Sequence, residues 1–210
     1  MSVSKVGHFL GKYRKDRKLL LATILVVILL AAGGYWYLAS KSPNAPPQFF
    51  EARNRAGEIS NRIVELTHTS VDNLELISAA DEAGRYKRGL ELTQEEIDRN
   101  AEVKNEAFKL SEELKIMALN LNEVRPKEAA EVGLQATTNG LELVQHLINY
   151  SNLTEELLGV LQTRLKSNGS PETRERIEQI ILRMNQEAEA VNKLNDEYRE
   201  EMKNFDRLTQ

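Results

Sequence analysis

The chain has 210 residues and no cysteine, which excludes disulfides, iron–sulfur clusters and thiol catalysis. Its formal net charge of −4 is unevenly distributed, because six cations and one acid give the first 18 residues a charge of +5 and leave −9 for the remainder. An acidic remainder argues against nucleic acid or anionic lipid as its main partner.

The first predicted element is a transmembrane helix over residues 19–38, a run without charged residues. At ~1.5 Å per residue this helix spans ~30 Å, the thickness of the hydrocarbon core of a bilayer. The basic tail, residues 1–18, places the N-terminus in the cytoplasm and the bulk of the chain outside a cell membrane that it crosses once. The predicted interface residues are Lys15, Arg17 and Lys18 on the inner side and Tyr35, Trp36 and Tyr37 on the outer side.

A cleaved signal peptide is the alternative interpretation of this N-terminal segment. The sequence Ala31-Ala32-Gly33 resembles a small-residue cleavage site. The apolar run nevertheless continues through the aromatic residues to full spanning length, which favours a retained anchor. Three prolines within residues 39–47 then predict a semi-rigid juxtamembrane linker.

Residues 48–210 predict an all-α domain. Apolar residues recur in alternating steps of three and four over segments 49–77, 103–124, 130–148 and 177–205. A repeat near 3.5 residues is typical of helices packed along their length, so we expect an elongated antiparallel bundle of about four long helices with coiled-coil-like packing. The core residues expected from the third helix are Ala130, Leu134, Thr137, Leu141, Val144 and Ile148.

Glycine and proline predict where these helices begin and end. Gly84 is a candidate C-cap for the first helix, and Pro126 and Pro171 mark the starts of the third and fourth. The sequence Thr93-Gln94-Glu95-Glu96 is a capping box that could start the second helix later. We favour the break at Gly84.

A di-metal carboxylate site is the most specific catalytic alternative, because four-helix bundles can hold such sites. The template needs two Glu-x-x-His motifs. Glu65 and His68 supply one, whereas Glu142 and His146 are one residue too far apart. The chain also lacks a nucleophile motif beside any histidine and a glycine-rich phosphate loop after a strand. We therefore expect no catalytic residue, metal or cofactor, and not an enzyme.

A stripe of small residues runs along the third helix beside its expected core stripe: Ala129, Gly133, Ala136 and Gly140. Each interior glycine costs ~1 kcal/mol relative to alanine, so a close approach of another helix would explain its presence. That helix could belong to a partner or to the same bundle. Substituting leucine at Gly133 or Gly140 would abolish partner capture in the first case and unfold the domain in the second.

The same helix is apolar over more than one face between Leu141 and Leu165, which favours enclosure within the bundle over partner binding. Taken together, the sequence predicts a membrane-anchored structural or protein–protein interaction module that binds a protein partner or a second copy through helical surfaces. The alternative is a ligand-sensing bundle, which would need a membrane partner for its output because the short tail holds no signalling domain.

Overall fold

The structure is a computed structural model that describes residues 44–167 and 171–210. No helix within the described residues is both long enough and apolar enough to cross a membrane. The predicted tail, membrane helix and most of the linker lie outside these residues. So do the predicted interface residues Lys15, Arg17, Lys18, Tyr35, Trp36 and Tyr37.

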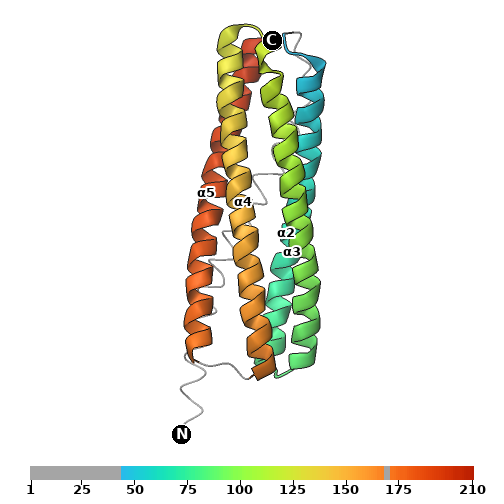
Figure 1. Cartoon of the computed structure of the whole chain (residues 1–210), viewed down its shortest axis with the longest axis vertical. Coiled ribbons are helices and arrows are strands. Elements are labelled where there is room, and N and C mark those ends of the chain that lie inside the picture. Colours follow the sequence, from blue (N-terminus) through green and yellow to red (C-terminus); the bar gives the residue numbers. More distant parts are fainter. Residues whose placement is uncertain (1–43, 168–170) are drawn as a thin grey trace.

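Four long helices form an elongated antiparallel bundle, as the sequence predicted (Figure 1). They are α2 (Pro47–Glu82), α3 (Tyr86–Leu119), α4 (Lys127–Ser167) and α5 (Pro171–Thr209), with a short 3₁₀ helix η2 (Leu121–Glu123) between α3 and α4. The helices have 36, 34, 41 and 39 residues. Proline begins α2 and α5, where its missing N–H would have no intrahelical partner.

The turn between α2 and α3 confirms the predicted break at Gly84. This glycine has a φ of 66°, a conformation that residues with a Cβ rarely adopt. The amide of Arg85 donates to the carbonyl of Ala80 at 2.8 Å, and the amide of Gly84 donates to Asp81 at 3.1 Å. This pair of hydrogen bonds is the Schellman motif that ends a helix. The alternative start at Thr93 is wrong, because α3 already begins at Tyr86.

The start of α2 and the end of α5 are tied together at one end of the bundle. The rings of Phe49 and Phe205 stack with centroids 4.8 Å apart. Beside them, the guanidinium of Arg53 binds the carboxylate of Asp206 through two hydrogen bonds of 2.5 and 2.8 Å, and both side chains are buried. Asn44 adds a hydrogen bond from its Nδ2 to the carbonyl of Thr209. We call this region the closed end.

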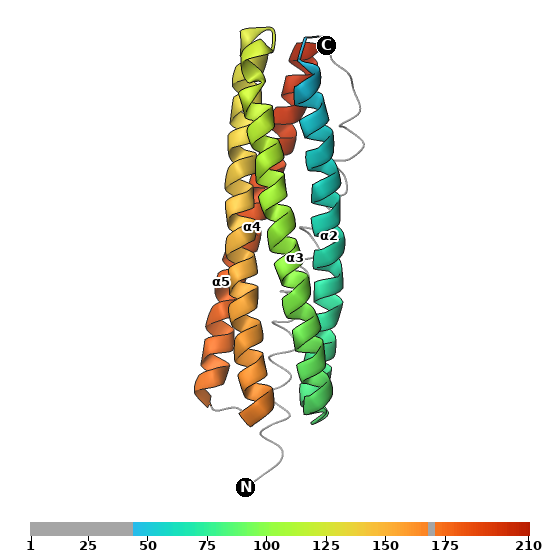
Figure 2. The ribbon, with the colours of Figure 1, turned by 45° about the vertical axis from the view of Figure 1, so that its right-hand side comes forward.

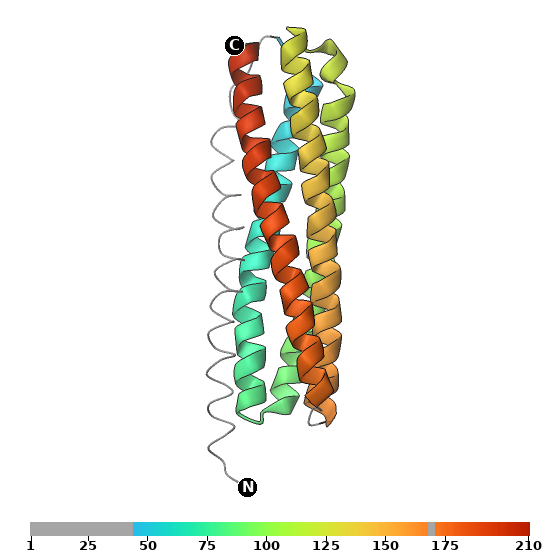
Figure 3. The ribbon, with the colours of Figure 1, turned by 90° about the vertical axis from the view of Figure 1, so that its left-hand side faces the viewer.

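Away from the closed end, α2 and α5 separate. Each helix packs along its neighbour in sequence, but among the described residues α2 and α5 do not pack along their lengths. Figure 2 shows them together near the C-terminus and apart at the other end, and Figure 3 shows them crossing.

The hydrophobic core is divided into three clusters along the bundle. A large cluster at the closed end draws on all four helices. It is followed by one cluster between α4 and α5 and another among α2, α3 and α4.

Helix α4 is the element that the two smaller clusters share. Leu153 and Leu157 face α5, whereas Leu158 and Leu165 face α2 and α3. This arrangement explains why the sequence of α4 is apolar over more than one face, and enclosure is confirmed from Val144 to Leu165, but not for Leu141, which is exposed.

The predicted core stripe of α4 is wrong at two positions. Leu134 and Leu141 are exposed, while Ala129 and Ala136 are fully buried. Both stripes fit a helical period, and the small residues turn inward because their size lets the neighbouring helices approach closely.

Candidate functional site

The small-residue stripe of α4 is packed inside the bundle. A Cβ placed on Gly133 would lie 2.6 Å from Cδ2 of Leu121 and 3.1 Å from the ring of Phe205. A Cβ on Gly140 would lie 3.0 Å from Cδ2 of Leu114. Ala129 and Ala136 are buried in the same cluster. The contacts of the stripe are therefore internal, and it is not available as a surface for a partner.

The outer face of α3 and α4 carries a different apolar feature. Phe108 and Leu119 of α3 are 51% and 68% exposed, and Leu134 and Leu141 of α4 are 55% and 39% exposed. Gly140 meets Leu114 and Gly133 meets Leu121, which places Leu134 and Leu141 level with residues 113–120 of α3, with Leu119 inside this range and Phe108 about one turn beyond it. We call these four exposed side chains, Phe108, Leu119, Leu134 and Leu141, the α3–α4 strip.

Sequence reasoning missed the α3–α4 strip for a simple reason. Leu134 and Leu141 are seven residues apart, the spacing of a core stripe, so the sequence pattern predicts that they are buried. The available signal was Phe108, a large aromatic residue beside the α3 core stripe rather than on it.

A layer of polar side chains lies inside the bundle where the core divides. Nδ2 of Asn73 on α2 donates to Oε2 of Glu96 on α3 at 3.2 Å and to the carbonyl of Leu92 at 3.1 Å. Arg99 also binds Oε2 of Glu96. One turn further, Nδ2 of Asn100 donates to the carbonyl of Ser151 at 2.8 Å, and Oγ of Ser151 donates to Oδ1 of Asn100 at 2.9 Å.

Glu96 is the most unusual member of this layer. Its side chain is fully buried, and Oε1 has no hydrogen-bond partner among the described residues. Burying a carboxylate with an unsatisfied oxygen is costly. The signal for this layer was present in the sequence, because Glu96 and Asn100 continue the steps of three and four that lead into Val103.

A cavity lies beside the polar layer, and all four helices contribute to its wall. Most of the wall is apolar, including Val64, Val71 and Leu74 of α2 and Ala188 and Val191 of α5. Its polar residues are Thr67, Ser70, Asn100, Tyr150 and Thr154. The enclosed space is about 50 Å³, room for a few water molecules or the narrow body of a small ligand.

The residues considered for a di-metal site do not converge. His68 is exposed on α2, and its Nδ1 lies 3.7 Å from Asp72 on the same helix. His146 on α4 lies 2.6 Å from Glu187 on α5. Within the described ranges, no group of three or more histidine or acidic side chains is placed to hold a metal ion.

Comparisons with protein-family models, with curated proteins and with solved structures each gave no match. The functional argument therefore rests on the geometry of the bundle itself.

Proposed function

We propose that this protein is a single-pass membrane-anchored interaction module that presents its helical bundle on the outer side of the membrane. The membrane part of the proposal rests on the apolar run over residues 19–38 and its basic inner flank. The interaction part rests on one observation, the α3–α4 strip.

The strip supports binding because large apolar side chains gain free energy when they leave water. Burial contributes roughly 25 cal/mol per Å², and adjacent exposed apolar side chains often mark binding surfaces. The strip draws on two neighbouring antiparallel helices that pack together, and a pair of helices can accept the apolar face of a third. We therefore propose a helical segment of another protein as the occupant, with self-association as the competing outcome.

The test is cross-linking in native membranes, comparing strip variants with matched controls. Leu134→Glu combined with Leu141→Glu places two charges on the strip. Leu76→Glu and Leu182→Glu place charges on leucines that are 54% and 61% exposed on α2 and α5, away from the strip. We expect the strip variant to lose the cross-linked species and both controls to keep it.

The mass of the cross-linked species identifies the occupant. A species of twice the chain mass indicates a second copy, and any other mass indicates a different protein. Loss of cross-linking in the control variants as well, or its persistence in the strip variant, contradicts the assignment of the strip.

The membrane part has its own measurement. The mass of the membrane-extracted protein should include residues 1–38, because we expect the anchor to be retained. A mature N-terminus near Gly34 would instead indicate a cleaved signal peptide and a secreted domain.

Ligand sensing is the second candidate function, and the cavity beside the polar layer is the observation that favours it. Apolar cavities with a few convergent polar groups are the usual form of small-molecule sites. In this case the signal would pass to a partner in the membrane.

A further inference from the structure

The cavity lies at the level where the four-helix core divides. On one side of this level the core draws on all four helices, and on the other it is split between two smaller clusters. Helices α2 and α5 do not pack along their lengths, and both contribute side chains to the cavity wall. Val64 and Val71 of α2 line the cavity together with Ala188 and Val191 of α5.

Three aliphatic hydroxyl groups of the wall, on Thr67, Ser70 and Thr154, are oriented as acceptors. Oγ1 of Thr67 donates to the carbonyl of Ile63 at 2.7 Å, and Oγ of Ser70 donates to the carbonyl of Leu66 at 3.1 Å. Oγ1 of Thr154 donates to the carbonyl of Tyr150 at 3.0 Å. Each hydroxyl uses its one proton on its own helix, so it offers only lone pairs to a molecule in the cavity.

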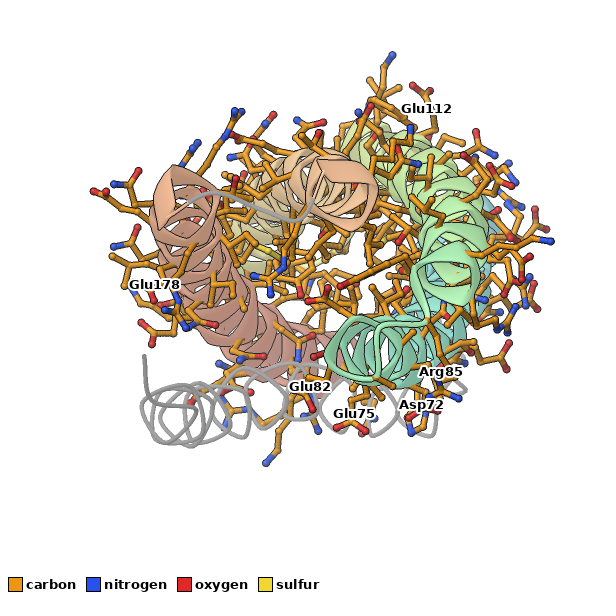
Figure 4. All side chains as sticks on the ribbon, turned by 90° about the horizontal axis from the view of Figure 1, so that it is seen from below. Asp72, Glu75, Glu82, Arg85, Glu112 and Glu178 are labelled. Atoms are coloured by element: carbon orange, nitrogen blue, oxygen red, sulfur yellow. The ribbon has the colours of Figure 1, made fainter. Side chains whose placement is uncertain are left out.

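A buried carboxylate lies close to the cavity wall. Glu96 lies one turn before Asn100, a wall residue. Its Oε2 binds Asn73 and Arg99, and its Oε1 has no partner among the described residues. Burial and the charge of Glu96 raise the pKa of Tyr150, another wall residue, so the field of this carboxylate reaches the wall. Asp72 and Glu75 of α2 are exposed and project outward from the bundle in Figure 4, so they do not line the cavity.

We propose that this cavity binds a small amine with an apolar body. The hydrocarbon part contacts the valine, leucine and alanine side chains, and the ammonium group donates hydrogen bonds to the acceptor hydroxyls near Glu96. The proposal deepens the second candidate function, ligand sensing, and is independent of the α3–α4 strip.

Methionine methyl groups provide a site-specific measurement on the full-length chain in lipid nanodiscs. The chain has four methionines, of which Met184 lies one turn from Ala188 beside the cavity. Met117 and Met202 belong to the cluster at the closed end and serve as internal controls. The probes are hexylamine, hexanol and hexanoate, which share an apolar chain and differ in charge.

We expect hexylamine to shift the Met184 ¹³C-methyl signal saturably, hexanol to do so at higher concentration, and hexanoate to leave it unchanged. The methyl signals of Met117 and Met202 should not shift. No saturable shift with any probe overturns both the amine proposal and the ligand-sensing candidate. Saturable binding of hexanoate or hexanol in place of hexylamine overturns the amine proposal alone.

Variants then test the location. Ala188→Leu fills the cavity from α5 and Ser70→Leu fills it from α2, and each should weaken hexylamine binding by about tenfold or more. Ala101→Leu makes the same substitution as Ala188→Leu, but at an exposed position on α3, and should leave hexylamine binding unchanged. Unchanged binding in either filled variant that retains its helical circular dichroism overturns the location.

Glu96→Gln tests the role of charge while keeping the shape of the side chain. We expect the preference for hexylamine over hexanol to fall to about twofold or less, because the charge that favours an ammonium group is gone. Hexanol binding should persist, which shows that the cavity remains intact. Retention of the full amine preference in this variant overturns the assignment of Glu96.

Discussion

Gly133→Ala tests whether close packing of the α4 stripe holds the bundle together. The new Cβ would lie 2.6 Å from Cδ2 of Leu121 and 3.1 Å from two ring carbons of Phe205. The ring of Phe205 is buried and stacked on Phe49, so it has little room to move. Alanine in place of an interior glycine gains ~1 kcal/mol of helix propensity, whereas overpacking a core costs ~1–3 kcal/mol. We expect a net loss of up to about 2 kcal/mol.

Thermal unfolding of the full-length chain in nanodiscs, followed by circular dichroism, measures this loss. For a domain of this size ~1 kcal/mol shifts Tm by ~2–4 °C, so Gly133→Ala should lower Tm by up to about 8 °C. Gly159→Ala is the matched control on the same helix, because a Cβ there meets nothing within 4 Å, and it should raise Tm. The Tm of Gly140→Ala should lie between those of the other two variants. A Tm for Gly133→Ala at or above that of Gly159→Ala would refute the reasoning and return the stripe to consideration as a partner surface.

Three further outcomes are expected. Asp206→Asn should lower the free energy of unfolding by about 3–5 kcal/mol, because it leaves the buried Arg53 without its counter-charge. Urea titration measures this free energy, and a loss below ~1 kcal/mol would contradict the prediction. Burial raises the pKa of Glu201 above its ordinary value of 4.5, so the folded state loses stability as pH rises from 4.5 through that raised pKa. Glu201→Gln, which can still accept from Asn139, should therefore raise Tm at pH 7 but not at pH 4, and an equal effect at both pH values would show that charge is not the cause. Purified residues 44–210 should give a strongly helical circular dichroism spectrum that EDTA does not change, and loss of helicity on chelation would revive the metal alternative.

The features of the fold that could be predicted from sequence are those encoded locally. The heptad-like spacing of apolar residues predicts long packed helices because each turn of the helix returns to the same face. The break at Gly84 was predictable because a left-handed backbone at a helix C-terminus favours glycine over every other residue.

The face that α4 turns inward could not be predicted in this way. Two stripes on α4 satisfy the same period, one with Leu134 and Leu141 and one with Gly133 and Gly140. Hydrophobicity alone favours the leucines. The choice depends on the space left by Leu121, which lies in a different segment of the chain.

The polar layer was missed for a related reason. Glu96 sits at a core position of α3, and a charged residue there normally argues against burial. Its burial depends on Asn73 from α2 and Arg99 from the next turn of α3, and no local pattern in α3 reveals the first of these contacts.

The distribution of these features along the bundle suggests how the two proposed functions could coexist. Asn44 donates to Thr209 and accepts from the amide of Arg125, so the chain enters the bundle at the closed end and is fixed there to both α5 and the α3–α4 connection. If residues 19–38 form the proposed anchor, the closed end is the part of the bundle nearest the membrane. The cavity lies further away, where α2 and α5 do not pack along their lengths. A ligand that draws α2 and α5 together would also shift α3 and α4, since α2 packs along α3 and α4 packs along α5. The α3–α4 strip would then be the surface through which occupancy of the cavity affects a partner.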